Sequence, residues 1–551
     1  MSKSFVFYSA LALVTLLLLS LAPTSALSQA FAATQWTQRG GDIPGKAAGD
    51  ESGVAVSSNS DGTIVAIGAH KNQGSGTDGG HVRVWAYSAG SWTQRGGDIN
   101  AEAANDFFGS SLSLSSDGTW LAVGAPGNDG TASNAGHVRV FRWIANAWTQ
   151  QGGDIDGESG SDASGTSVAL SGDGTTVVIG AYLNAGGGIA RGSARVYEWN
   201  SGTSAWDKVG GDLDGSATAD RAGEAVAINS SGDIVAIGAR QNDDNGVDSG
   251  HVRVYSTDGT TWSLVGSALQ GEAAGDYFGD SVSLNSDGTR LAVGAKLNSI
   301  GGTAAAAGHV RVFEFGAGSW SQLGSDIDGA AAGDEFGTSV SLNDAGTRFI
   351  AGSPQTSAGS ARVFEFSGST WSQLGSDLVG DAAGDEAGQS VAMSANGTAV
   401  IIGAYLNDDG GADAGEASVF TYEAEVSVTA SSEAGVPGIY LYVAGPLGRS
   451  AQGSPVYYGS DRVAVASTYV LTVTSVSNPT HPVFVLAQGL VDAQGNLEAT
   501  ATLPGLAPGS YDVALSGQHL SGIGLKLIAR ITIGSAGTFT ALSPNTSSIY
   551  G

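Results

Sequence analysis

The sequence predicts an all-β protein, a seven-bladed β-propeller followed by a β-sandwich. Glycine contributes 86 of the 551 residues and proline only 12, which is typical of short strands joined by many tight turns. A tryptophan-led unit occurs seven times along the chain. Within each unit, apolar and polar residues alternate with a period of two, as they do in half-buried strands.

Residues 1–32 have the pattern of a secretory signal peptide. Lys3 precedes an apolar run from Phe5 to Ala22, and small residues suited to cleavage follow before residue 33. A retained anchor helix is the alternative, because the run approaches the roughly 20 residues of a membrane span. In both cases the rest of the chain is predicted to be extracytoplasmic, either secreted or at the cell surface. If the signal is cleaved, no membrane insertion is expected.

The seven units define a predicted propeller over residues 33–424. Their leading tryptophans, which lie 51 to 58 residues apart, are Trp36, Trp92, Trp148, Trp206, Trp262, Trp320 and Trp371. In the fifth unit, residues 281–284, 291–294 and 309–315 are three predicted strands, and the tryptophan segment is a fourth. Four strands are what one propeller blade contains.

Turns and ring closure follow from the order of the segments. Asp-Gly or Asn-Gly joins the first two strands of most units, and we expect a two-residue hairpin with positive φ there. Seven such sheets must close into a ring or leave an exposed edge. Residues 36–40 precede every first strand, whereas residues 416–422 have no tryptophan strand after them. The N-terminal segment is therefore predicted to complete the last blade as its outermost strand.

The segments DYFGDSVSLNSDGTRLAVGA, DFFGSSLSLSSDGTWLAVGAP and DEFGTSVSLNDAGTRFIAGSP resemble the FG-GAP repeats of integrin α-subunit propellers and their bacterial relatives. The resemblance spans about residues 34–424. It implies a seven-bladed propeller that binds partners on one loop-rich face. In integrin-type propellers, several hairpins between the first and second strands carry an Asp-rich calcium loop. The equivalent connections here are bare turns that could not supply six or more oxygen ligands, so calcium is not expected in them.

Composition excludes several classes of function. The absence of cysteine excludes disulfide scaffolds, thiolate zinc sites and iron–sulfur clusters. A formal net charge of -29 argues against nucleic acid or an anionic membrane as the partner. The sequence contains no HExxH, GxSxG, P-loop or dinucleotide-binding motif, so no catalytic residue and no cofactor is assigned.

The loops between the second and third predicted strands are the candidate ligand-binding positions. They vary in sequence while the flanking strands stay alike, and rigid scaffolds usually carry function on such loops. The expected partner is an extracellular protein or glycan. An asparagine recurs early in these loops, where a role in the turn is the alternative to ligand contact. The candidate residues are Asn72, Asp78, Asn128, Asp129, Asn184, Asn242, Asn298 and Asn407.

Two of these loops are more acidic than a turn requires, which makes them candidates for calcium. Carboxylate and amide oxygens suit a hard cation, although neither loop has the regular alternation of a recognised calcium loop. The candidate metal ligands are Asp243, Asp244, Asn245, Asp248, Asp408, Asp409 and Asp413.

Three other residue types recur at fixed places. An aspartate before each first strand, such as Asp50, is expected to cap its own turn, with a ring of carboxylates near the channel as the alternative. Histidine opens the third strand in four units, as at His81, and is expected to form a hydrogen bond there rather than bind a metal. Arginine two residues later, as at Arg83, is expected to pair with acids on a solvated face.

Residues 425–551 lack the tryptophan repeat. Runs such as YVLTVTSV and LKLIARITIG, separated by turn residues, predict a β-sandwich. The stretch GNLEATATLPGLAPGSYDVALSG resembles a hairpin of bacterial immunoglobulin-like surface domains, which serve as stalks or adhesion modules. The whole chain is therefore predicted to be a secreted or cell-surface binding or adhesion protein rather than an enzyme. A polysaccharide-acting enzyme that uses paired carboxylates and a purely structural envelope protein are the alternatives.

Overall fold

The computed structural model describes residues 36–186, 189–300 and 305–422 with their side chains, and the backbone of eight further strands between Ser427 and Ala541. Residues 34–423 form one compact unit, and the strands after residue 426 belong to a second. All the regular secondary structure in the described residues is β-strand, which confirms the all-β prediction. The predicted signal peptide lies outside these residues. Nowhere in the described part does a helix have the length and apolar character needed to cross a membrane.

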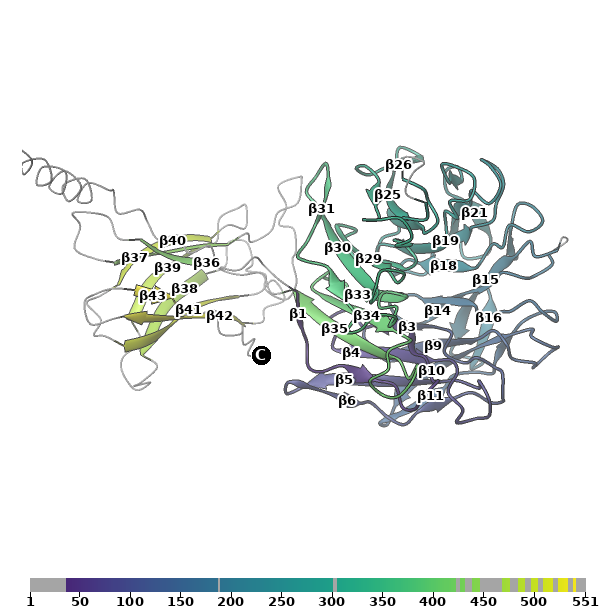
Figure 1. Cartoon of the computed structure of the whole chain (residues 1–551), viewed down its shortest axis with the longest axis horizontal. Helices are drawn as coiled ribbons and strands as arrows, with labels where there is room; N and C mark the ends of the chain where they lie inside the picture. Colours follow the sequence, from purple (N-terminus) through teal and green to yellow (C-terminus); the bar gives the residue numbers. More distant parts are fainter. Residues whose placement is uncertain are drawn as a thin grey trace, which may run out of the picture. The chain divides into compact units, whose positions relative to one another are not determined.

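The first unit is a propeller of seven antiparallel sheets, as predicted (Figure 1). Each blade has three inner strands and an outermost strand that is interrupted, so that both of its short segments pair with the third strand. From the centre outward, the strands of the first three blades are β3 (Ser52–Ser58), β4 (Ile64–Ala69), β5 (His81–Ser88), β6 (Ser91–Gln94) and β7 (Ile99–Asn100) in blade 1; β8 (Ser111–Leu114), β9 (Trp120–Ala125), β10 (His137–Ile144), β11 (Ala147–Gln150) and β12 (Ile155–Asp156) in blade 2; and β13 (Ser167–Leu170), β14 (Thr176–Ala181), β15 (Ser193–Asn200), β16 (Ala205–Lys208) and β17 (Leu213–Asp214) in blade 3.

In the same order, the next three blades contain β18 (Ala225–Ile228), β19 (Ile234–Ala239), β20 (His251–Thr257), β21 (Trp262–Leu264) and β22 (Leu269–Gln270) in blade 4; β23 (Ser281–Leu284), β24 (Arg290–Ala295), β25 (His309–Gly316), β26 (Ser319–Gln322) and β27 (Ile327–Asp328) in blade 5; and β28 (Val340–Leu342), β29 (Arg348–Ser353), β30 (Ser360–Phe366), β31 (Trp371–Gln373) and β32 (Leu378–Val379) in blade 6. Blade 7 combines both ends of the propeller, with β33 (Ser390–Met393), β34 (Ala399–Ala404), β35 (Glu416–Tyr422), β1 (Trp36–Gln38) and β2 (Ile43–Pro44).

The hydrophobic core lies between neighbouring blades. The cluster between blades 1 and 2 joins Val82 and Val84 of β5 to Phe108 and Leu121 of the next blade. All six residues of β9 are buried, because each sheet is covered on both faces by its neighbours.

The recurring tryptophans connect each blade to the one before it. Every leading indole N–H donates a hydrogen bond of 2.7 to 2.9 Å to a backbone carbonyl in the preceding blade, at the point where the outermost strand of that blade is interrupted. Trp36 is buried and the other six indoles are half-buried, and an indole N–H withdrawn from water needs such a partner, which explains why tryptophan and not phenylalanine recurs. The acceptors of Trp36, Trp92, Trp148, Trp206, Trp262, Trp320 and Trp371 are the carbonyls of Leu374, Arg39, Arg95, Gln151, Val209, Val265 and Leu323.

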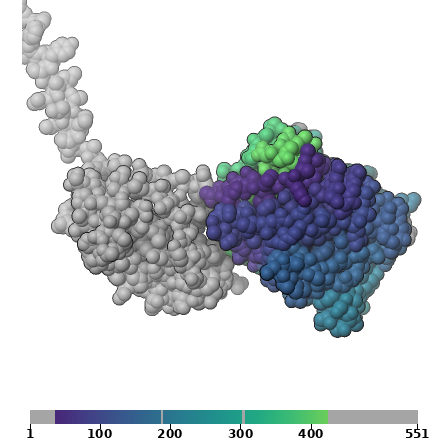
Figure 2. Space-filling model, turned by 90° about the horizontal axis from the view of Figure 1, so that it is seen from below, coloured from purple at the N-terminus to yellow at the C-terminus, as the bar shows by residue number. Residues whose placement is uncertain are grey.

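The ring is closed by the N-terminal segment, as predicted. β1 pairs antiparallel with β35, with Thr37 opposite Thr421, and β2 pairs with the other end of the same strand. Figure 2 shows these N-terminal residues, in purple, against the green residues of the last blade. Trp36 packs in the core cluster shared by blades 6 and 7, so the closing strand also contributes to the interior.

The turns between first and second strands differ from the predicted two-residue hairpins. In blade 1 the turn spans residues 59–63, and Gly62 is its only position with positive φ, at 68°. The Asn59 side chain accepts hydrogen bonds from the N–H groups of Thr63 and Ile64 and so replaces the missing backbone pairs of a tight hairpin. Neighbouring turns are joined by backbone hydrogen bonds of 2.8 to 3.1 Å that complete a circle through Ser60, Ser116, Gly172, Ser230, Ser286, Asp344 and Ala395.

The strands beyond residue 426 form two sheets. One contains β36 (Ser427–Ser431), β37 (Ile439–Gly445) and β40 (Leu497–Leu503). The other contains β39 (Phe484–Leu490), β38 (Thr468–Ser475), β41 (Gly509–Gln518), β42 (Gly524–Ile533) and β43 (Phe539–Ala541). The immunoglobulin-like β-sandwich remains a prediction, because much of residues 425–551 lies outside the described part.

Candidate functional site

The six candidate loop asparagines lie inside the propeller. Asn72, Asn128, Asn184, Asn242, Asn298 and Asn407 are each 1% to 8% exposed. Asn72 illustrates their role: its Oδ1 accepts the N–H of Gly74 at 2.9 Å, and its Nδ2 donates to Asp50 at 3.0 Å. This geometry fits the turn alternative, and it leaves these side chains little access to a ligand. Asp78 is half-buried at a positive φ of 50°, while exposed Asp129 accepts the N–H of Asn134.

The aspartate that recurs before each first strand caps a turn. In all seven blades its Oδ2 accepts the N–H of the residue three positions earlier, at 2.7 to 2.9 Å, as the Asp50 to Ala47 pair does at 2.9 Å. The carboxylate therefore holds the chain that enters the blade, in the way the capping interpretation anticipates.

Each acidic loop uses one carboxylate to hold its own turn, while Asp244 Oδ2 lies 3.5 Å from Nδ1 of His251, which opens the third strand. Asp243 Oδ1 accepts the N–H of Asp248 at 2.8 Å, and Asp408 Oδ1 accepts that of Asp413 at 2.9 Å. Asn245 donates to the carbonyl of Gly271 instead of facing the acids. Among the described residues, the groups of acids and histidines whose ligand atoms converge lie elsewhere.

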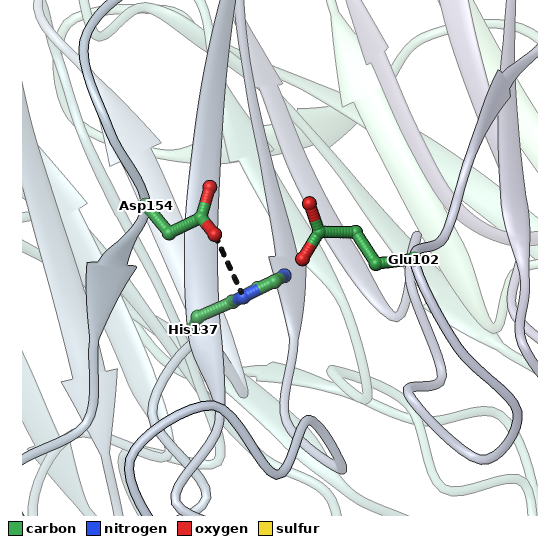
Figure 3. A group of neighbouring side chains, drawn as sticks. All are labelled: Glu102, His137 and Asp154. Atoms are coloured by element: carbon green, nitrogen blue, oxygen red, sulfur yellow. Dashed lines mark ion pairs between the residues drawn. The ribbon is translucent and has the colours of Figure 1, made fainter.

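Converging polar groups recur at one place in the blades. Each group combines the first residue of the third strand, an acid six residues after the leading tryptophan, and an acid from the segment that enters the blade. In blade 2 these are His137, Asp154 and Glu102, with 3.9 Å between His137 Nδ1 and Asp154 Oδ2 (Figure 3). Blade 5 has His309, Asp326 and Glu272, and blade 7 has Glu416, Asp42 and Asp381. Ligand atoms within each group lie within 4.8 Å of one another.

The four histidines that open third strands are buried, and the Nε2 atom of each has no hydrogen-bond partner among the described residues. His81 is 1% exposed, and neither ring nitrogen has a partner among the described residues. Burial, followed by the nearby charge of Arg83, lowers the pKa of His81 to about 4, and burial followed by the charge of Arg311 lowers that of His309 to about 4. These rings are therefore neutral at physiological pH.

Four of the six third-strand arginines are buried and the other two, Arg253 and Arg362, are half-buried, which corrects the expected solvated face. Arg83 is 7% exposed and donates from Nη2 to the carbonyl of Pro44 at 2.6 Å. Arg311 donates to the carbonyl of Gln270 at 2.7 Å, lies 4.4 Å from the Phe278 ring centre, and approaches Glu272 at 3.5 Å. The alternation of valine and arginine is typical of a strand with one face in solvent. In the propeller a neighbouring blade covers each face, so the guanidinium group lies between two blades.

Sequence reasoning missed the acids of the blade 7 group, because Asp42, Asp381 and Glu416 come from opposite ends of the repeat array. Glu416 is 3% exposed, and its Oε2 has no hydrogen-bond partner among the described residues. Burial and the charges of Asp42 and Asp381 raise the pKa of Glu416 to about 8. A signal did exist in the sequence: Glu416 replaces the usual histidine or serine, and Ser418 replaces the arginine of the other six blades.

Comparison with known proteins identifies the repeat. The FG-GAP repeat family model matches residues 101–141 and 380–420, which enter blades 2 and 7 and end in their third strands. No curated protein matches the chain. Similar solved structures include a Bacteroides uniformis ATCC 8492 protein assigned provisionally as a 6-phosphogluconolactonase, at 11% identity and a TM-score of 0.44, covering 80% of this chain and 99% of that one.

A protein from Lactobacillus plantarum has 12% identity and a TM-score of 0.44, with the same two coverages of 80% and 99%. The Dos1 propeller has 11% identity and a TM-score of 0.40, covering 71% of this chain and 94% of its own. At these values the structural matches do not bear on function. The protein is thus a seven-bladed β-propeller with FG-GAP repeats in two places, a fold that fits a binding or structural role.

Proposed function

We propose that the protein is a secreted or cell-surface binding protein that recognises an extracellular protein or glycan through the loops between the second and third strands of its blades. The observation that carries this proposal is a pair of exposed apolar side chains. Ile189 is 83% exposed and Val247 is 68% exposed, each five residues after the buried loop asparagine of its blade. Single exposed apolar residues are ordinary on protein surfaces, but these two occupy the same loop position in the neighbouring blades 3 and 4, which favours one shared contact surface.

The loops that carry these residues are held by the scaffold. The carbonyl of Ile189 accepts the N–H of Ala219 at 3.0 Å, and that of Val247 accepts the N–H of Gly275 at 2.8 Å. Both donors belong to the segment that enters the next blade. Side chains presented on a fixed backbone lose little entropy on binding, which favours a recognition role.

The enzymatic alternative has less support. A hydrolytic pair of carboxyl groups has to reach the sugar. Glu416, which forms a group with Asp42 and Asp381, is only 3% exposed, so this group offers a substrate little access.

The proposal is tested by a glycan array and an extracellular pull-down with the full chain and with Ile189→Ser/Val247→Ser. We expect the double variant to lose at least about tenfold in affinity, since two buried aliphatic contacts are worth more than 1.4 kcal/mol. Ile144→Ser is the matched control, because Ile144 is 44% exposed but lies at the end of β10, outside these loops. Equal binding by the wild type and the double variant would refute the assignment of this face.

A further inference from the structure

Blade 7 differs from the other blades at the junction where the ring closes. In blades 1 to 6 the third position of the third strand is arginine, whereas in blade 7 it is Ser418. Those arginines bring a fixed positive charge to the segment entering the blade, as Arg311 does beside Glu272 and Arg139 does beside Glu102 at 3.7 Å. Ser418 instead donates to Asp42 Oδ1. Blade 7 therefore lacks its internal cation.

The same junction is also the most acidic of the seven. At the position of Asp381, blades 2, 3 and 5 have glutamate and blades 1, 4 and 6 have lysine, serine or alanine. At the position of Glu416 the other six blades have histidine or serine, so blade 7 alone has an acid at both positions. The charges that act most strongly on Glu416 are all carboxylates, those of Asp42, Asp381, Asp409 and Asp385. Asp409 belongs to one of the two acidic loops in which the sequence predicted calcium, so that loop borders the junction without forming its centre.

The geometry of the three carboxylates suits one ion. Calcium binds oxygen at about 2.3 to 2.6 Å, so two ligands of one ion are at most about 5 Å apart. The ligand oxygens of Asp42, Asp381 and Glu416 lie within 4.8 Å of one another. Asp42 is oriented by hydrogen bonds to Oδ1 from Gln38 and Ser418.

Glu416 supplies an independent indication of a ligand. It is 3% exposed, lies in the group, and its Oε2 has no hydrogen-bond partner among the described side chains and backbone. A buried carboxylate without a partner is costly, and a coordinated cation removes that cost.

We propose that Asp42, Asp381 and Glu416 bind a divalent, oxygen-seeking cation such as Ca²⁺, which takes the place of the arginine of the other six blades. Asp42 belongs to the N-terminal closing segment, Glu416 to β35, and Asp381 to the segment that enters blade 7. The ion therefore joins the two ends of the ring through its coordination sphere. Water and backbone oxygens complete the six to eight ligands that calcium takes.

The test is a calcium titration of the full chain after treatment with a chelator, followed by calorimetry and thermal melting. We expect one site with a Kd near the 0.1 to 1 mM range of extracellular modules. At a hundredfold excess over Kd, the melting temperature is expected to rise by about 3 °C. A melting temperature and a heat signal that do not respond to calcium would overturn the proposal.

Variants distinguish a cation from a shared proton. Glu416→Gln and Asp42→Asn remove one ligand charge each and are expected to abolish the calcium response. Asp377→Asn is the matched control, because Asp377 has the position of Asp42 in blade 6, where Ser360 and Ala330 replace the other two acids. Calcium binding of wild-type strength in Glu416→Gln would contradict the site.

A third variant restores the arginine. Ser418→Arg is expected to raise the melting temperature of the calcium-free protein and to remove its response to calcium, because the guanidinium occupies the position of the ion. If Ser418→Arg does not fold, Glu416→Gln still decides the question. A folded Ser418→Arg protein that responds to calcium as the wild type does would show that the ion binds elsewhere.

Discussion

Removal of the Trp36 side chain tests how much the closing strand contributes to stability. Trp36 is 8% exposed, packs in the cluster shared by blades 6 and 7, and donates from Nε1 to the Leu374 carbonyl at 2.8 Å. Burial of about 200 Å² at about 25 cal/mol per Å² corresponds to about 5 kcal/mol, and the hydrogen bond adds about 1 kcal/mol. Measured truncations of buried aromatic residues cost about 3 to 5 kcal/mol, so we expect Trp36→Ala to lose about 4 kcal/mol.

The assay is urea unfolding together with calorimetry. For a unit spanning residues 34–423, an unfolding entropy of about 2.1 cal/mol/K per residue converts this loss into a melting temperature lower by about 5 °C. Thr37→Ala is the control, because Thr37 is exposed on the same strand and its loss is expected to change stability by less than about 0.5 kcal/mol. A loss below about 1 kcal/mol for Trp36→Ala would refute the claim that β1 completes the ring.

Two further predictions concern blade contacts and pH. Gly68→Ala places a Cβ 2.1 Å from the Gly109 carbonyl of the next blade and is expected to destabilise by more than about 3 kcal/mol in urea unfolding; Gly41→Ala, with nothing within 4 Å, is expected to be neutral. The pKa of His81 and of His309 is about 4 in the folded protein, against 6.5 for a free histidine, so the unfolded chain takes up protons first as the pH falls. Stability contributed by the neutral rings is therefore complete above about pH 6.5 and is lost towards pH 4, by up to about 3 kcal/mol per ring. The free energy of unfolding, plotted against pH over this range, should have a shallower slope for His309→Gln than for the wild type. An unchanged slope would contradict the argument that burial lowers the pKa of His309.

Much of the fold could be predicted because the sequence repeats one structural unit. Seven tryptophan-led units, within which apolar and polar residues alternate with a period of two, predict seven blades, and the order of segments predicts that β1 pairs with β35. The type of turn between the first and second strands was predicted wrongly. The Asp-Gly pair does not reveal that the Asn59 side chain accepts the backbone N–H groups that a tight hairpin would pair with carbonyls.

The candidate site was harder to predict, because its residues are joined only by the fold. Local acidity drew attention to residues 243–248 and 408–413, whereas Asp42 and Glu416 are brought together by ring closure. The buried position of Arg83 was also missed, since alternation along one strand does not show that a neighbouring blade covers the polar face. Comparing the same position across all seven units, where Ser418 and Glu416 stand out, is the signal that leads to the junction.

The most direct test of ring closure is an engineered disulfide, because the chain contains no cysteine of its own. Thr37 and Thr421 are directly opposite each other in the β1–β35 pair, and opposite residues of antiparallel strands have the Cα separation that a disulfide needs. Thr37→Cys/Thr421→Cys should oxidise to a single intramolecular disulfide, detected by altered mobility without reductant and by a higher melting temperature. Thr37→Cys/Tyr422→Cys, one residue out of register, should not. Failure of the first pair to form the bond, or equal oxidation of both pairs, would contradict closure of the seven-bladed ring by its N-terminal strand.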